Sequence, residues 1–284
     1  MRPANLVTSV ADVLAGATIS AAVIKGSTLS ATDIILVCLS TIGLYGGGVV
    51  FNDVFDATLD AVERPERPIP SGLITKNNAA LLGLALLIPG ILFAFLINQI
   101  AGIVAIFIAV LALLYDKWGK HQSLLGPVNM GACRGLNLML GVSLLTVALA
   151  KVWLLAFVPV VYIAAITMTS RGEVHGGKPA ILYATAVLYL LVLLAITAIA
   201  LQKKHIIETL PFLLLFASLI AVPLSKAIRQ PIGKNIGKAV KAGVISLIVM
   251  DACWASAFGS FFTALIILLL LPLSLWLAKL FAVT

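Results

Sequence analysis

The sequence predicts an all-α membrane protein, a polytopic bundle of nine or ten transmembrane helices around a central cavity open to the cytoplasmic side. Hydrophobic residues make up 62% of the 284 residues and charged residues only 11%, which excludes an ordinary soluble domain. Apolar runs of spanning length recur along the whole chain, separated by short polar breaks. The longer polar loops fall on one side of the predicted membrane, which favours a cavity opening there; they cover residues 52–77, 116–125, 170–178 and 226–237.

Ten apolar segments are each of plausible length to cross a bilayer as one helix. They cover residues 6–24, 33–51, 78–97, 99–115, 126–148, 152–169, 179–200, 209–225, 238–257 and 260–281. The connections within 78–115 and 238–281 are very short, so nine helices is the alternative. The first segment contains Asp12 and lacks a convincing cleavage site, so we expect a helix instead of a signal peptide. No linker or low-complexity tract divides the chain, which predicts one domain over residues 1–284.

The basic residues predict the orientation of the chain. Of the nineteen lysines and arginines, fourteen fall on the side of the amino terminus, four on the other side, and Arg134 inside a helix. This is a positive-inside pattern, so we expect a multi-pass membrane protein with cytoplasmic polar loops. The net charge of +8 then reflects topology and attraction to anionic lipid or substrate. Nothing resembles a nucleic-acid-binding motif, so we expect no nucleic-acid partner.

Acidic side chains cluster directly after the second apolar segment. Residues 52–66, NDVFDATLDAVERPE, carry five of the chain's eleven acidic residues, although Asp and Glu are costly at membrane depth. If this segment continues the helix, Asn52, Asp53, Asp56 and Asp60 fall on one face at about 100° per residue. Three carboxylates and an amide oxygen suit Mg²⁺, which often also contacts substrate phosphates. The alternative is a solvated, negatively charged loop; the cost of such clustering favours the metal site.

A basic turn follows the acidic segment, and the two together resemble a known family. Arg64 and Arg67 lie in ERPERPIPSG, where they can neutralise the acids or bind a phosphate. NDVFDATLD followed by RPERPIPSG resembles the first signature of the UbiA-type intramembrane prenyltransferases, NDxxDxxxD followed by an RPIPSG-like turn. Tyr115 and Lys120 in YDKWGK match the spacing of the family's YSxxLK segment, whose basic residue reaches the substrate diphosphate. For Lys120 the alternative is ordinary positive-inside charge.

The resemblance implies a helical bundle around a central cavity and a Mg²⁺-dependent transfer of an isoprenyl group. Family members bind an isoprenyl diphosphate through Mg²⁺ held by two acidic motifs. The metal and basic residues stabilise the departing diphosphate, and an electron-rich lipophilic acceptor attacks the allylic cation. The apolar cavity excludes water that would quench this cation. The implied partners are an isoprenyl diphosphate, a lipophilic acceptor and membrane lipid, and the implied cofactor is Mg²⁺.

The second acidic motif departs from the family pattern. The family usually has DxxxD, often DxExD, after the sixth helix, where this chain has SRGEVHGGK. Aligned on Glu173, the aspartates become Arg171 and His175; arginine cannot coordinate a cation, and imidazole is a poor Mg²⁺ ligand. Either one metal suffices, with Arg171 supplying the second positive charge, or prenyl transfer is lost and the scaffold is a non-catalytic carrier or binding protein for a lipophilic metabolite. A polar loop with a Gly-Gly turn is the plain alternative.

An arginine lies inside the fifth predicted helix, GPVNMGACRGLNLMLG. Arg134 falls near the middle third of the span, where an unpaired charge is costly. Asn137 lies three residues further on and hence on the same face, which we expect to look into the cavity. Arg134 is predicted to pair with a substrate anion or with an acid; the candidate acids are the Asp53 cluster, Asp12 and Asp251. The alternative is a buried structural ion pair.

Three features also resemble the EboC subgroup of UbiA-like proteins: the altered second motif, the CRGLN run and the opening RPANLVTSVADVLAG. That subgroup is linked to bacterial secondary-metabolite gene clusters and to export of a metabolite precursor, so we expect a bacterial inner membrane. The predicted catalytic residues are Asp53, Asp56, Asp60, Glu173 and His175, with Glu173 supporting the metal site and His175 assisting deprotonation. The predicted diphosphate-binding residues are Arg67, Lys120, Arg134 and Arg171. The predicted metal ligands are Asn52, Asp53, Asp56 and Asp60.

Overall fold

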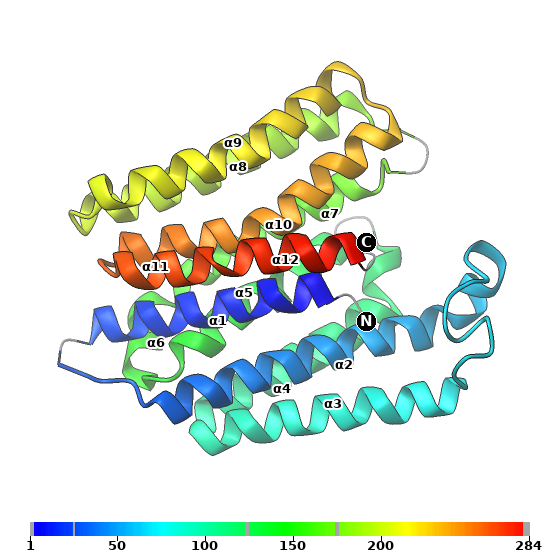
Figure 1. Ribbon diagram of the computed structural model, residues 1–284, viewed down its shortest axis with the longest axis horizontal. Helices are drawn as coiled ribbons and strands as arrows, with labels where there is room; N and C mark the ends of the chain where they lie inside the picture. The colour runs from blue at the N-terminus through cyan, green and yellow to red at the C-terminus, as the bar shows by residue number, and fades with distance from the viewer. Residues whose placement is uncertain (1–2, 25, 123–124, 174–175, 281–284) are drawn as a thin grey trace.

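The computed structural model describes residues 3–24, 26–122, 125–173 and 176–280, and in this part of the chain every regular element is a helix. The α-helices are α1 (Pro3–Val23), α2 (Ala31–Glu63), α3 (Lys76–Ile97), α4 (Gln99–Lys117), α5 (Leu125–Val142), α6 (Thr146–Val152), α7 (Phe157–Ser170), α8 (Pro179–Gln202), α9 (Ile206–Arg229), α10 (Gly233–Ala257), α11 (Phe261–Leu268) and α12 (Leu270–Leu280). Two 3₁₀ turns, η1 (Gly119–His121) and η2 (Trp153–Ala156), join them. The long helices run roughly along one axis (Figure 1), which confirms the predicted all-α polytopic fold.

Each of the ten predicted segments coincides with a helix or with a pair of short helices. In the described part of the chain, eight spans are long and apolar enough to cross a membrane, counting Thr146–Ser170 and Phe261–Leu280 as one span each. The remaining two long helices, α5 and α10, are not among these eight spans and carry the buried charged residues Arg134 and Asp251. They pack inside the bundle because lipid would not solvate those groups.

The two predicted C-terminal boundaries that differ most from the structure are the ends of the second and fifth helices. The fifth helix ends at Val142 and not at 148, and here Nδ2 of Asn98 donates a hydrogen bond to the carbonyl oxygen of Ser143. That bond satisfies a backbone oxygen which a continued helix would otherwise have bonded. The second helix continues well beyond residue 51, through the acidic segment to Glu63. The extension confirms the helical continuation on which the predicted metal site depends.

Helix α1 lies in the middle of the bundle, in contact with α2, α5, α10 and α12. Two glycines let α1 and α5 approach backbone to backbone. A Cβ atom at Gly16 would lie 2.2 Å from the carbonyl oxygen of Leu138, and one at Gly141 would lie 2.2 Å from that of Val13. Small residues at such crossings are how membrane helices gain close packing. The contact fixes α5, and therefore Arg134, against α1.

Replacing Gly141 with alanine is expected to destabilise the protein by about 1–3 kcal/mol, because the new methyl group would overlap the α1 backbone. The thermal midpoint of the detergent-solubilised protein, followed by circular dichroism, measures the effect. Gly237→Ala in α10 is the matched control, since nothing lies within 4 Å of its Cβ position and alanine is the better helix former. Equal midpoints for the two variants would contradict the close α1–α5 contact.

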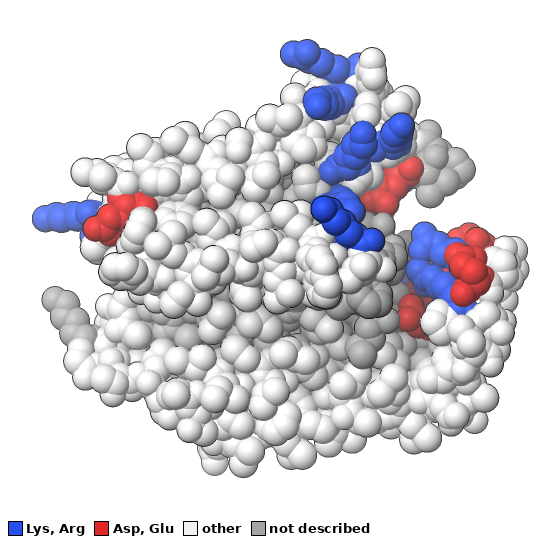
Figure 2. All heavy atoms as spheres, in the orientation of Figure 1, with Lys and Arg blue, Asp and Glu red and all other residues white. Residues whose placement is uncertain are grey.

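Charged side chains gather at the two ends of the bundle. On the face drawn in Figure 2, a broad band without charged residues separates the two ends, and lysine and arginine predominate at one of them. Large apolar side chains point outward along the helices; Leu81, Leu190 and Leu214 are each more than half exposed. Apolar surface of this extent is stable only in lipid. The chain is therefore a multi-pass integral membrane protein.

Candidate functional site

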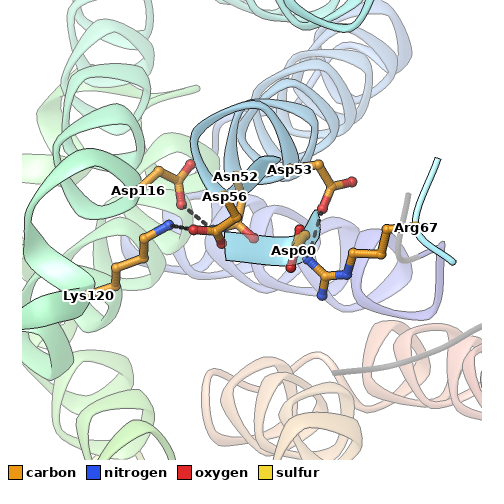
Figure 3. Close-up of polar contacts among 7 residues, drawn as sticks. All are labelled: Asn52, Asp53, Asp56, Asp60, Arg67, Asp116 and Lys120. Atoms are coloured by element: carbon orange, nitrogen blue, oxygen red, sulfur yellow. Dashed lines mark hydrogen bonds and ion pairs between the residues drawn. The ribbon is translucent and has the colours of Figure 1, made fainter. Parts of the chain in front are cut away.

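The acidic motif occupies the last turns of α2. Helix α2 ends at Glu63, and Arg64 is the residue before a proline, a position that disfavours helical backbone. The carbonyl oxygen of Asp60 accepts a hydrogen bond from the Arg64 N–H, which closes the last turn. All four predicted ligands are therefore held on regular helix, and Figure 3 shows how their side chains divide.

Two of the acids face the basic turn that follows α2. Nη1 of Arg67 lies 2.7 Å from Oδ2 of Asp60 and 3.6 Å from Oδ1 of Asp53. Asp60 is buried and Arg67 is half-buried, so water screens this pair less than it screens a surface ion pair. The turn is closed by the N–H of Ser71, which donates to the carbonyl oxygen of Arg67. The structure thus places Arg67, a predicted diphosphate ligand, against the acidic motif.

The other two motif side chains face α4 and η1. Nδ2 of Asn52 donates a 2.9 Å hydrogen bond to Oδ1 of Asp116, and Nζ of Lys120 pairs with Oδ1 of Asp56. Asp116 lies in the last turn of α4 and Lys120 in η1 directly after it, so one short segment supplies both partners. These four residues, the outer cluster, point toward one another in Figure 3. Lys120, the second predicted diphosphate ligand, therefore also lies beside the acidic motif.

Asp116 is the candidate that the sequence prediction missed. This residue is only 5% exposed, and it lines the same cavity as Asn52 and Lys120. The segment YDKWGK was interpreted through Tyr115 and Lys120, and Asp116 stands where the family's YSxxLK segment has serine. The usable signal was an acid at the end of an apolar span, the same signal that marks Asp53.

The predicted metal ligands divide into two groups, one beside Arg67 and one beside Lys120. Among the residues that the structure describes, no group of three or more His, Cys, Asp and Glu side chains is arranged to hold a metal ion. Asn52, Asp56 and Asp116 nevertheless lie close together and carry amide and carboxylate oxygens, which are the ligands that Mg²⁺ prefers, although Asn52 turns its amide nitrogen to Asp116. A cation already lies against Asp56, namely the Lys120 ammonium. The outer cluster therefore fits Mg²⁺ in the chemistry of its donors.

A cavity of about 480 Å³ begins at the outer cluster and extends into the bundle. Its polar lining at the outer end includes Arg64 and Glu173, and further in it includes Asn5, Thr8 and Thr41. Its apolar lining consists of side chains from α2, α4, α5, α7 and α10: Leu44, Val49, Ile108, Ala112, Met130, Ile163, Ile166, Val240, Val244 and Leu247. Asn52 and Thr41 lie about 16 Å apart along α2 at about 1.5 Å per residue, so the cavity reaches far into the bundle.

The inner end of the cavity holds a second set of polar side chains, the deep cluster, made of Asp12, Thr41, Arg134 and Asn137. Nε of Arg134 lies 2.6 Å from Oδ2 of Asp12, and both residues are buried. Nδ2 of Asn137 donates to the same Asp12 oxygen over 2.8 Å, and the Thr41 hydroxyl donates to Oδ1 of Asn137 over 2.7 Å. The predictions that Arg134 shares a face with Asn137 and pairs with an intramembrane acid are confirmed.

Of the candidate acids, Asp12 is the one that forms the ion pair with Arg134. Asp251 of α10 is buried beside this pair and interacts with both of its members. The Asp53 group pairs with Arg67 instead. The charge of Arg134 is therefore matched inside the bundle.

The second motif contributes to the cavity through one residue only. Glu173 lines the same cavity as the outer cluster, whereas the described lining residues do not include Arg171. Nη2 of Arg171 donates a 2.7 Å hydrogen bond to the carbonyl oxygen of Gln122, and the side chain is exposed. His175 lies outside the described residues. The structure thus brings Glu173, but not Arg171, to the site.

Comparisons with known proteins agree with this architecture. The sequence model that describes the UbiA prenyltransferase family matches residues 13–241 of this chain. Digeranylgeranylglyceryl phosphate synthase of Methanosarcina mazei is 36% identical over 136 residues, which are 48% of this chain and 46% of that protein. The chain matches about half the length of such curated relatives.

Two solved structures share the fold. The apo structure of a UbiA homologue from Aeropyrum pernix K1 superposes with a TM-score of 0.70 at 18% identity, covering 87% of this chain and 96% of that one. A UbiA homologue from Archaeoglobus fulgidus bound to DMAPP and Mg²⁺ gives a TM-score of 0.58 at 15% identity, covering 87% and 99%.

Proposed function

This chain belongs to the UbiA prenyltransferase family, and we propose that it transfers an isoprenyl group from an isoprenyl diphosphate to a lipophilic acceptor in the membrane, with Mg²⁺ as cofactor. The observation that carries the proposal is the outer cluster, where hard oxygen ligands and a lysine meet at one end of a largely apolar cavity. The M. mazei relative, a digeranylgeranylglyceryl phosphate synthase, and the homologue that binds DMAPP and Mg²⁺ support it.

The proposed metal ligands are Asn52, Asp53, Asp56 and Asp60, and we add Asp116, whose carboxylate lies 2.9 Å from Nδ2 of Asn52. Bound Mg²⁺ would neutralise the negative charge that grows on the departing diphosphate. Asn52, Asp56 and Asp116 are the ligands that already converge. Asp53 and Asp60 hold Arg67 in place beside them.

Basic side chains next to these acids are the proposed diphosphate ligands. Lys120 and Arg67 each lie against a motif carboxylate, and Arg64 lines the outer end of the cavity. An ammonium or guanidinium in this position stabilises the leaving oxygens by charge-assisted hydrogen bonds. In the second motif, Glu173 lines the cavity and remains the proposed acid that supports the metal site, and His175 remains the proposed proton acceptor. Arg171, which bonds to the carbonyl oxygen of Gln122, would have to turn toward the cavity to bind the diphosphate.

The apolar lining of the cavity serves the chemistry by excluding water. Leu44, Ile108 and Ile166 cover the space beyond the outer cluster, so an allylic cation formed there meets the acceptor before it meets solvent. We place the outer cluster on the cytoplasmic side, because the basic loops lie there. A bacterial inner membrane, the EboC subgroup and a single domain over residues 1–284 remain predictions; the relative and the structures named above are archaeal.

The proposal is tested by diphosphate release from geranylgeranyl diphosphate, with protein in lipid nanodiscs that contain candidate acceptors. We expect release that requires Mg²⁺ and falls at least about 100-fold in Asp56→Ala, because this change removes a metal ligand and the partner of Lys120. Asp33→Asn near the start of α2 is the control acid and should leave the rate unchanged. Absence of Mg²⁺-dependent release from C10, C15 and C20 diphosphates would overturn the proposal.

A non-catalytic carrier or binding protein for a lipophilic metabolite is the second candidate. It is favoured by the second motif, where Arg171 and His175 replace acids and the Arg171 side chain points to a backbone carbonyl instead of the cavity. Mass spectrometry of lipids that copurify with the protein separates the two. A retained ligand without a diphosphate, unaffected by Asp56→Ala, supports the carrier.

A further inference from the structure

The arginine of the deep cluster has hydrogen-bond donors left over. A guanidinium carries five N–H donors, and the ion pair with Asp12 is made through Nε. Nη2 is buried without a hydrogen-bond partner in the described part of the chain. Oδ2 of the neighbouring Asp251 is likewise buried without a hydrogen-bond partner among the described residues. Because buried donors are almost always satisfied, an unpaired donor on a residue that lines a cavity indicates an acceptor supplied from outside the chain. Arg134 lines that cavity.

The charges around Arg134 favour a neutral acceptor over an anion. One guanidinium faces two carboxyl groups, Asp12 at 2.6 Å and the neighbouring Asp251. The deep cluster therefore offers no excess positive charge, and an anionic group placed there would lie close to both carboxyl groups. The outer cluster begins at Asn52, about three helical turns from Thr41 along α2, and the cationic lining residues Arg64 and Lys120 lie at that end. Phosphate chemistry belongs to that end.

The other residues that line the cavity indicate the size and polarity of the ligand. Thr8 of α1 lies one helical turn from Asp12 and adds a hydroxyl group to the cavity lining, and Asn5 lies one turn further toward the N-terminus of α1. Most of the other side chains between the two ends are apolar. A cavity of about 480 Å³ is of the size that holds a small organic ligand. An apolar tail that ended against Arg134 would leave the unpaired donors unsatisfied. A molecule with an apolar body and one oxygen at its inner end satisfies them.

We propose that the deep cluster binds the prenyl acceptor, and that this acceptor is a neutral, lipid-soluble molecule whose carbonyl or hydroxyl oxygen accepts a hydrogen bond from Arg134. The identification of the ligand as the acceptor rests on the proposed function; the neutral-ligand site itself does not. The inference separates this chain from the M. mazei relative, whose named product carries a phosphate. It also removes Arg134 from the diphosphate ligands and gives it a role in acceptor choice.

The experiment measures binding of tritiated decylubiquinone, a neutral carbonyl probe, to the full chain in nanodiscs, with protein-free nanodiscs subtracted. The double variant Asp12→Asn with Arg134→Met removes the donors together with the carboxylate that pairs with them, so that Asp251 is the one carboxyl group left beside the site. We expect its affinity for the probe to fall by about tenfold or more, the value of one hydrogen bond to a charged group. Arg229→Gln, at the exposed end of α9, is the matched control and should bind as the wild type does.

Two results would overturn the inference: unchanged probe affinity in the double variant, or displacement of the probe by decyl phosphate at lower concentration than by unlabelled decylubiquinone. If the double variant does not elute as one folded species, Arg134→Lys replaces it. That variant keeps the positive charge, lacks the guanidinium fork, and should show the same loss.

Binding of geranylgeranyl diphosphate with Mg²⁺ is measured on the same samples. If the wild type fails to bind it while the probe still depends on Arg134, the proposed function fails and the neutral-ligand site stands. If the wild type binds and turns over the diphosphate while the probe affinity of the Arg134 variant equals that of the wild type, the inference alone fails.

Discussion

Asp116→Asn is expected to lower Mg²⁺-dependent diphosphate release at least about 100-fold, the usual loss when one group that stabilises transition-state charge is removed. The amide keeps an oxygen that can accept the hydrogen bond from Asn52, so the α2–α4 contact survives while the carboxylate charge is lost. The loss should therefore appear in kcat/KM for isoprenyl diphosphate and not in the thermal midpoint. Asp116 acts in this way only if the outer cluster is the metal site.

Metal affinity gives a readout of Asp116 that does not depend on turnover. Titration with Mn²⁺, followed by electron paramagnetic resonance, should show binding at least about tenfold weaker in Asp116→Asn, because a hard cation loses one anionic ligand. Glu208→Gln is the control, since Glu208 is an exposed acid that pairs with His205 at the start of α9. Wild-type Mn²⁺ affinity together with a wild-type rate in Asp116→Asn would exclude Asp116 from the site.

Most of the fold and half of the site could be predicted from the sequence. Hydropathy sets the spans because lipid admits little besides apolar helix, and ten segments became helices where they were expected. Helical geometry then placed Asp56 and Asp60 on consecutive turns of α2. The resemblance in YDKWGK singled out Lys120, which the structure places against Asp56.

The rest depends on contacts between segments far apart in the chain. Asn52 and Asp116 meet because α2 and α4 pack together, and no local pattern encodes that pairing. Helical periodicity could not show that the acidic face divides between Arg67 and Lys120, since both partners come from other segments. Alignment on Glu173 gave the position of Arg171 in the second motif but not the direction of its side chain. That direction depends on the hydrogen bond to the carbonyl oxygen of Gln122, a residue far away in the sequence.

The outer cluster and the deep cluster differ in charge, so each end of the cavity suits a different kind of ligand group. The outer cluster combines carboxylates with a lysine, groups that a metal and a multiply charged phosphate can bind, and it lies toward the C-terminal end of α2. In the deep cluster the charge of Arg134 is matched by Asp12, and the unpaired Nη2 of Arg134 can donate a hydrogen bond to a neutral oxygen. A substrate with a charged head and an apolar tail can therefore enter one end, while a neutral partner occupies the other.

Arg134→Met alone is expected to destabilise the protein by about 3–5 kcal/mol, the cost of leaving the other member of a buried ion pair uncompensated. Asp12 is 1% exposed, and without Arg134 it would face Asp251 while keeping the hydrogen bond that Asn137 donates. The thermal midpoint in detergent measures the loss, and Asp12→Asn should produce a loss of its own by leaving Arg134 unmatched.

The double variant should be more stable than Arg134→Met, because replacing both partners removes the uncompensated charge as well as the pair. The amide oxygen that Asp12→Asn introduces could still accept the hydrogen bond from Asn137, so the polar contact between α1 and α5 would persist. A double variant that loses the sum of the two single losses would contradict coupling between Asp12 and Arg134. Since the same double variant removes the proposed acceptor's hydrogen bond, recovered stability together with lost probe binding would separate the structural role of the pair from its part in recognition.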